Sequence, residues 1–223
     1  MQVHQISAQQ IQSKEAFLKI AAAYIASGTS AVSNSSTSHH VSGTCFLVET
    51  PALIDASLSE VSSAFFDGNK DIALQLFEAV KKNVFSLVDG ILVEQKSACI
   101  SRLGDLFTEI EWLLHDKPVR AFPYYKDQIV CTGAVLGSAL FYHFLLEQAV
   151  DAVFVDSRDC IVTSDDFGEA GVLESITQAR IQQTFIPGRT HVTQAGIGAT
   201  DQNENAMLTA EGNDWVLKTI KGL

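Results

Sequence analysis

The side chains in this sequence that could most readily bind a metal ion are aspartates. Four of them crowd into one short segment, and Asp55 lies far upstream; the four are Asp156, Asp159, Asp165 and Asp166. Carboxylate oxygens are common ligands of hard divalent cations. Acids gathered in a turn are more often solvated, however. We therefore interpret these aspartates as a solvated turn and predict no metal site.

Cysteine and histidine could supply nucleophiles or zinc ligands, but their spacing favours neither role. The four cysteines form no CxxC pair, and each lies in an apolar run: Cys45, Cys99, Cys131 and Cys160. A zinc site needs clustered cysteines or histidines, whereas the adjacent His39 and His40 lie in a Ser-rich stretch. We interpret the cysteines as reduced core residues and residues 28–43 as a surface loop. No GxSxG, HExxH or P-loop pattern occurs.

The elements that must position any site alternate along the chain. Short apolar runs predict strands at 3–6, 45–48, 152–155, 160–162 and 190–193. Apolar residues at helical spacing predict helices at 13–27, 127–148, 173–185 and 214–220. Residues 45–48 are apolar throughout, as in a strand buried on both faces. We expect an α/β fold, a three-layer α/β/α sandwich with a mainly parallel sheet.

Residues 57–115 interrupt this alternation with a helical region. They contain no proline, and apolar residues recur at spacings of three and four. The pattern predicts two or three helices, with breaks at Gly68-Asn69 and at Asp89-Gly90. We therefore expect a single domain over 1–223 with a helical insertion at about 57–117.

Composition and charge exclude some functions. The chain has 223 residues, of which 47% are hydrophobic, enough for one well-filled core. Its formal net charge is -11, which disfavours binding to nucleic acid and to anionic membranes. The N-terminus does not resemble a signal peptide, and the longest apolar run, 130–146, is interrupted by glycines. We expect a cytoplasmic protein.

The segment 147–170 carries the most informative motif. It reads EQAVDAVFVDSRDCIVTSDDFGEA. This order closely resembles the aspartate kinase pattern G-x-D-A-x-x-x-D-A-R-D-x-I-x-T-D-x-x-F-G-x-A. Other segments resemble the family in the same order. Residues 1–11 resemble its opening strand and loop, residues 48–58 resemble its second strand, and residues 127–140 resemble a helix near the substrate. Residues 193–201 resemble its last strand, and residues 208–215 resemble its Gly-rich loop. The resemblance covers the chain, but only about the first two-thirds of a family kinase domain.

The resemblance implies an amino-acid-kinase fold with an amino-acid substrate site. It implies that Arg158 contacts the substrate carboxylate, which suits the bidentate fork of a guanidinium. It further implies that Asp214 meets the ammonium group and that Phe167, Gly168 and Gly212 lie near the pocket.

An alternative for Arg158 stays open. The guanidinium could instead pair with Asp156, Asp159 or Asp166 and hold the loop in shape.

The chain departs from the family at the positions that handle phosphate. Phosphoryl transfer depends on cations and close backbone approach. The family's Lys and Gly-Gly in the first loop are replaced here, its Gly-rich loop lacks an Arg and a Gly, and a helix carboxylate is missing. The replacing residues are Gln5, Ser7, Ala8, Ala210, Glu211 and Ala134. The family also continues with a nucleotide-binding half, which we expect this chain to lack.

Three functions follow as expectations. The first is an aspartokinase-like protein, a pseudoenzyme with impaired catalysis and no cofactor, which retains a site for an amino acid or small carboxylate. The second is an active aspartate kinase, which phosphorylates L-aspartate with ATP and Mg²⁺ for lysine, threonine and methionine biosynthesis and is completed by a companion chain. The third is an interaction module that forms a homodimer through an exposed sheet edge or the helices of 57–115.

Overall fold

The computed structural model describes residues 1–11, 13–26 and 43–223. The predicted loop at 28–43, with His39 and His40, therefore lies outside the described residues except for Gly43. The central sheet has four parallel strands in the order β1-β2-β4-β3. These strands are β1 (Gln2–Ile6), β2 (Thr44–Val48), β4 (Thr190–Gln194) and β3 (Ala152–Phe154). An antiparallel pair, β5 (Ile197–Ala199) and β6 (Asn205–Met207), follows β4.

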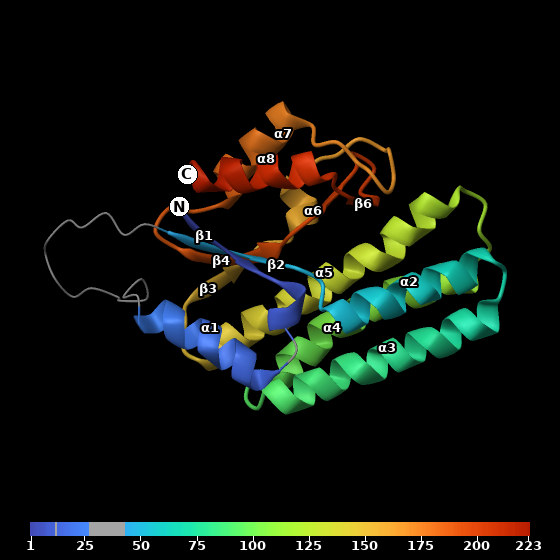
Figure 1. Ribbon diagram of the computed structural model, residues 1–223, viewed down its shortest axis with the longest axis horizontal. Helices are drawn as coiled ribbons and strands as arrows, with labels where there is room; N and C mark the ends of the chain where they lie inside the picture. The colour runs from blue at the N-terminus through green and yellow to red at the C-terminus, as the bar shows by residue number, and fades with distance from the viewer. Residues whose placement is uncertain (12, 27–42) are drawn as a thin grey trace, which may run out of the picture.

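Helices cover both faces of the sheet, which gives the three layers that the alternating pattern predicts. In Figure 1, α7 (Glu174–Thr184) and α8 (Ala210–Lys221) lie above the sheet, and α1 (Lys14–Ala26) and α5 (Phe122–Glu147) lie below it. All five residues of β2 are buried, and their side chains alternate between two cores. Cys45 and Leu47 belong to the core under α7 and α8, whereas Phe46 and Val48 belong to the core over α1 and α5. The mainly parallel α/β fold is confirmed.

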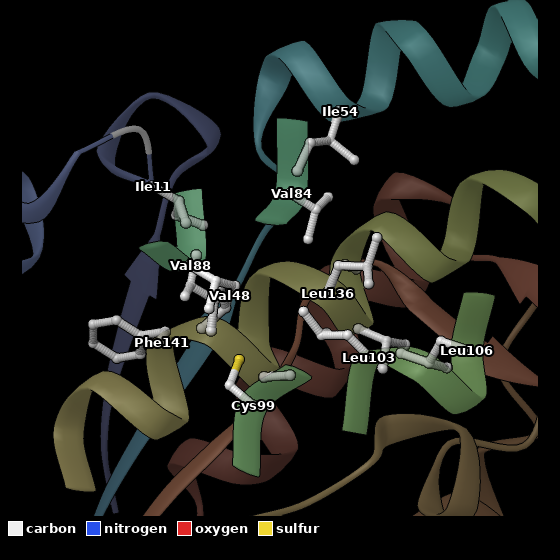
Figure 2. Close-up of a cluster of buried hydrophobic side chains, with 14 of the residues drawn as sticks. Ile11, Val48, Ile54, Val84, Val88, Cys99, Leu103, Leu106, Leu136 and Phe141 are labelled. Carbon is white, nitrogen blue, oxygen red and sulfur yellow. The ribbon is translucent and has the colours of Figure 1, made fainter. Parts of the chain in front are cut away.

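Three further helices extend the lower layer where helices were predicted. They are α2 (Ala52–Phe66), α3 (Lys70–Ile91) and α4 (Lys96–His115). Their buried side chains join those of α5 and β2 in one continuous core, which Figure 2 shows around Val84, Leu103 and Leu136. The chain turns at 67–69 as predicted, but Gly90 lies inside α3.

Helix α5 passes through the centre of this core. It is long and apolar enough to span a membrane by length and composition, but 89% of its apolar window is buried inside the protein. Apolar side chains all round a helix are expected when the helix is buried on every side. Pro123 lies in its first turn, where a missing N–H costs no hydrogen bond.

Three predicted boundaries are wrong. Helix α5, predicted to begin at 127, begins at Phe122. The predicted strand at 160–162 overlaps a short helix, α6 (Ser157–Cys160), and Val162 makes only an isolated bridge with Ala199. Helix α8 begins at Ala210 instead of Asp214, because the side-chain oxygen of Thr209 accepts the Gly212 N–H and caps the helix.

Candidate functional site

A pocket of about 420 Å³ lies outside the carboxyl ends of β1, β2 and β4. Because these strands are parallel, the residues that follow them meet at one edge of the sheet, the usual place for a ligand in an open α/β sheet. The pocket is lined by Ala8, Glu49, Thr50, Ala52, Asp55, Val130, Cys131, Ala195, Gly196, Ile197, Met207 and Asn213.

The segment after β2 lies directly on α5, which fixes one wall of the pocket. A Cβ atom on Gly133 would lie 2.4 Å from the Thr50 methyl carbon. One turn later, a Cβ atom on Gly137 would lie 3.0 Å from the carbonyl oxygen of Glu49 and 3.0 Å from Pro51 Cδ. The two glycines therefore let the backbone of residues 49–51 approach the helix closely, and this approach sets where the Glu49 side chain begins.

The Glu49 carboxylate joins the loop after β2 to the loop after β1. Its Oε2 accepts the backbone N–H of Ala8 at 3.0 Å. Asp55, in the first turn of α2, is the other charged residue of the pocket lining. Within the described residues, no Lys, Arg or His lines this pocket. Its lining is thus acidic, with two carboxylates and no countercharge.

The opposite wall is held by a hydrogen bond between the β4–β5 turn and α8. Gly196 adopts a φ of +75° in this turn, which glycine tolerates best. Its N–H donates to Asn213 Oδ1 at 3.0 Å. Cys131 contributes a thiol to the floor, and burial raises its pKa well above 9.0, with a smaller contribution from the charge of Asp127. The thiol is therefore protonated and a poor nucleophile.

Asp127 ties the pocket floor to the motif segment. It is fully buried, and its Oδ2 accepts the N–H groups of Gly168 at 2.8 Å and Met207 at 2.9 Å. Its Oδ1 has no hydrogen-bond partner among the described residues. Burial raises the pKa of this carboxyl, although the two backbone hydrogen bonds oppose the shift.

Arg158 lies in α6, outside the lining of the pocket. Its Nε and Nη2 donate to the two carboxylate oxygens of Asp156 at 2.9 and 2.7 Å, and its Nη1 donates to Asn205 Oδ1 at 3.2 Å. The side chains of Arg158 and Asp156 are only 20% and 19% exposed. The bidentate face of the guanidinium is thus occupied by a neighbouring carboxylate, one of the pairings left open by the sequence.

The other predicted binding residues do not gather around one cavity. Phe167 packs edge-on against Tyr124, and Gly168 is exposed with a φ of +92°. Gly212 is buried in the first turn of α8, and Asp214 is exposed on the same helix. None of these four lines the pocket, whose lining takes Asn213 from this turn instead.

The positions where the chain departs from the family pattern are also dispersed. Ala8 lines the pocket, and Ser7 beside it binds Gln10 through its N–H and hydroxyl. Gln5 is exposed on the edge strand β1, and Ala134 is buried in α5. The remaining two, Ala210 and Glu211, are exposed at the start of α8.

Sequence reasoning missed Glu49 and Asn213 as residues of the site. A signal for Glu49 was present, since it directly follows the apolar run 45–48 of β2, and residues after parallel strands line the ligand-binding edge. Asn213 carries no such signal, because its contact with Gly196 depends on how α8 packs beside β5.

Three solved structures with this fold are aspartokinases. The chain is similar to E. coli aspartokinase III in complex with lysine and aspartate (17% identity, TM-score 0.73, covering 98% of this chain and 45% of that one). It is similar to the same enzyme in complex with aspartate and ADP (17%, TM-score 0.77, 99% and 46%). It is also similar to Clostridium acetobutylicum aspartate kinase (11%, TM-score 0.68, 99% and 45%).

These likenesses show an aspartokinase-like fold. The chain spans less than half the length of the enzymes that it resembles. No model of a known protein family matches the sequence, and no curated protein is significantly similar to it.

Proposed function

We propose that this chain is an aspartokinase-like protein that does not transfer phosphoryl groups on its own and needs neither ATP nor Mg²⁺ for its role. The observation that carries this proposal is the charge of the pocket at the strand ends, where Glu49 and Asp55 are the charged lining residues. Phosphoryl transfer relies on positive charge around the transferring group. A carboxylate about 4 Å from a phosphate charge costs about 4 kcal/mol at the dielectric typical of protein surfaces.

The hydrogen bond between Glu49 and Ala8 supports the same proposal. Ala8 stands where the resemblance places a glycine of the phosphate loop, and its backbone N–H already donates to Glu49. An incoming phosphate would have to displace that carboxylate and then meet its negative charge. The local polarity therefore opposes a bound anion.

An assay for ADP formation tests the proposal. The purified chain is incubated with ATP, Mg²⁺ and L-aspartate beside E. coli aspartokinase III as a positive control, and ADP is measured by a coupled enzyme reaction. We expect no ADP above the level of the buffer with the chain alone. Aspartate-dependent ADP formation that scales with the concentration of the chain would refute the proposal.

A retained site for an amino acid or small carboxylate at Arg158 is part of the proposal and has its own test. The guanidinium is only one-fifth exposed and its fork holds Asp156, so a ligand carboxylate must compete with that pair. Calorimetric titration with aspartate should then show weak binding that Arg158→Gln abolishes. Binding of equal strength in this variant would place the ligand elsewhere.

A second candidate function is an active aspartate kinase that is completed by a companion chain. The chain covers less than half of the solved aspartokinases. In this candidate, a second polypeptide supplies a nucleotide-binding half and restores aspartate phosphorylation in the cytoplasm. The ADP assay, repeated with proteins that co-purify with the chain, tests this candidate. Continued absence of ADP formation with every such protein would remove it.

Self-association is supported by the edge strand β1. It pairs with β2 on one side, and no other described strand pairs with it. Unpaired strand edges can accept a strand from another copy, so a homodimer is the third candidate. Light scattering at micromolar concentrations tests it, and a monomer at every concentration would argue against this role.

A further inference from the structure

We propose that the pocket at the strand ends binds an aliphatic ammonium compound, for which a linear diamine is the simplest probe. Its volume of about 420 Å³ lies in the range of small-molecule sites. The inference rests on the proposed function, because a pocket that attracts ammonium groups is a poor place for a phosphate.

The two carboxylates of the pocket offer acceptors for the ammonium groups of such a ligand. Glu49 Oε2 is held by the Ala8 N–H, which fixes the carboxylate, while its Oε1 makes no hydrogen bond to any described residue. Asp55 is exposed at the beginning of α2, and its carboxylate likewise has no described ion-pair partner. An ammonium group carries three donors and no acceptor, so it can satisfy these oxygens as a charge-assisted partner.

The remaining lining defines the body of the ligand. Seven of the twelve lining residues present aliphatic or sulfur-containing side chains: Ala8, Ala52, Val130, Cys131, Ala195, Ile197 and Met207. Such a surface suits a chain of methylenes, since each buried CH₂ contributes about 0.8 kcal/mol. A short hydrocarbon with ammonium ends therefore matches both the apolar and the acidic parts of the pocket.

The same lining discriminates against anions. A ligand carboxylate or phosphate would approach two negative charges without a cation among the described lining residues to offset them. The guanidinium of Arg158 does not line the pocket and is already paired with Asp156. Anion binding at Arg158 and amine binding at the pocket are therefore separate events that respond to different substitutions.

The test compares three probes of equal chain length by titration calorimetry in an amine-free buffer of low ionic strength. They are 1,5-diaminopentane, pentane-1,5-diol and glutarate, which carry positive, neutral and negative ends. We expect saturable binding of the diamine, no binding of the diol, and no glutarate binding beyond the weak carboxylate binding that Arg158→Gln abolishes. Binding of glutarate or the diol as tightly as the diamine, or no saturable diamine binding up to about 1 mM, would overturn the proposal.

Three variants locate the binding site. Glu49→Gln keeps an oxygen that can accept the Ala8 N–H, and Asp55→Asn changes an exposed residue, so both variants should fold. Each substitution removes one negative charge from the pocket and should weaken diamine binding about tenfold. Asp105→Asn removes the same charge from the exposed face of α4 and should leave the affinity unchanged. Thermal unfolding verifies that each variant is folded. Unchanged affinity in both pocket variants, or an equal loss in the control, would refute the assignment.

The outcome is independent of the test for phosphoryl transfer, because the titration contains no ATP. If the chain forms ADP with aspartate but also binds the diamine at Glu49 and Asp55, the proposed function fails and the amine site stands. If the chain forms no ADP and binds no diamine, the amine site fails and the proposed function stands.

Discussion

The buried histidine of α5 leads to a quantitative prediction about pH. His143 is only 5% exposed, its Nδ1 lies 3.4 Å from Gln95 Oε1, and its Nε2 has no hydrogen-bond partner among the described residues. Burial, followed by the positive charge of Arg102, lowers the pKa of its imidazole from 6.5 to about 4. The neutral ring is therefore strongly preferred in the folded state.

The sign of the effect follows from proton binding. The folded-state pKa of His143 lies below the unfolded value, so the unfolded chain binds more protons between pH 6.5 and pH 4. The contribution of the neutral ring to stability is present above pH 6.5 and is lost as the pH falls toward 4. With these two pKa values, the loss between pH 7 and pH 5 is roughly 2 kcal/mol.

Urea unfolding of the wild type and of His143→Leu at pH 7 and pH 5 measures this loss. The free energy of unfolding of the wild type should fall by about 2 kcal/mol more than that of the variant over this interval. His115→Leu is the matched control, because His115 is exposed at the end of α4 and its replacement should preserve the wild-type pH dependence. Identical pH dependence in the wild type and His143→Leu would refute the reasoning.

Three further predictions concern the stability of the scaffold, each measured by urea unfolding. Asp127→Ala should lower the free energy of unfolding by about 2–4 kcal/mol because two backbone N–H groups lose their acceptor. Asp127→Asn keeps an acceptor oxygen and should cost less; equal losses in the two variants would contradict this reason. Gly198→Ala should lower the free energy of unfolding by about 3 kcal/mol, since the new Cβ would lie 2.6 Å from a backbone oxygen. Gly104→Ala places its Cβ in open space on a helix and should raise the free energy of unfolding by about 0.5–1 kcal/mol. Arg158→Gln should cost about 1–3 kcal/mol, because it removes the charged partner of Asp156, and an unchanged midpoint would show that this pair is dispensable.

The sequence predicts the elements whose patterns are set by burial. Strand β2 is apolar from residue 45 to residue 48 because both of its faces are covered, and α7 lies within one residue of its predicted bounds. Helix α6 was missed because its first turn is held in part by a distant side chain. The Asp156 carboxylate accepts the Arg158 N–H, and Gln194 Oε1 accepts the Ser157 N–H at 2.6 Å. A propensity-based prediction does not include the second of these contacts.

The site is harder to predict because it is assembled from separate loops. The family resemblance directed attention to Arg158 and Asp214, one of which pairs with its neighbour while the other is exposed. Glu49 and Ala8 are brought together by the register of β1 on β2, in which Ile6 lies beside Val48. Register is a tertiary property, so the acidic character of the pocket emerges only when the strands are paired.

Titration calorimetry with MgATP tests the central claim most directly, because it measures whether the acidic pocket and its surroundings hold a nucleotide at all. We expect no saturable heat for the chain alone at nucleotide concentrations up to about 1 mM. Saturable binding of one MgATP per chain, weakened by substitutions at Ala8 or Asn213 in the pocket lining, would contradict it.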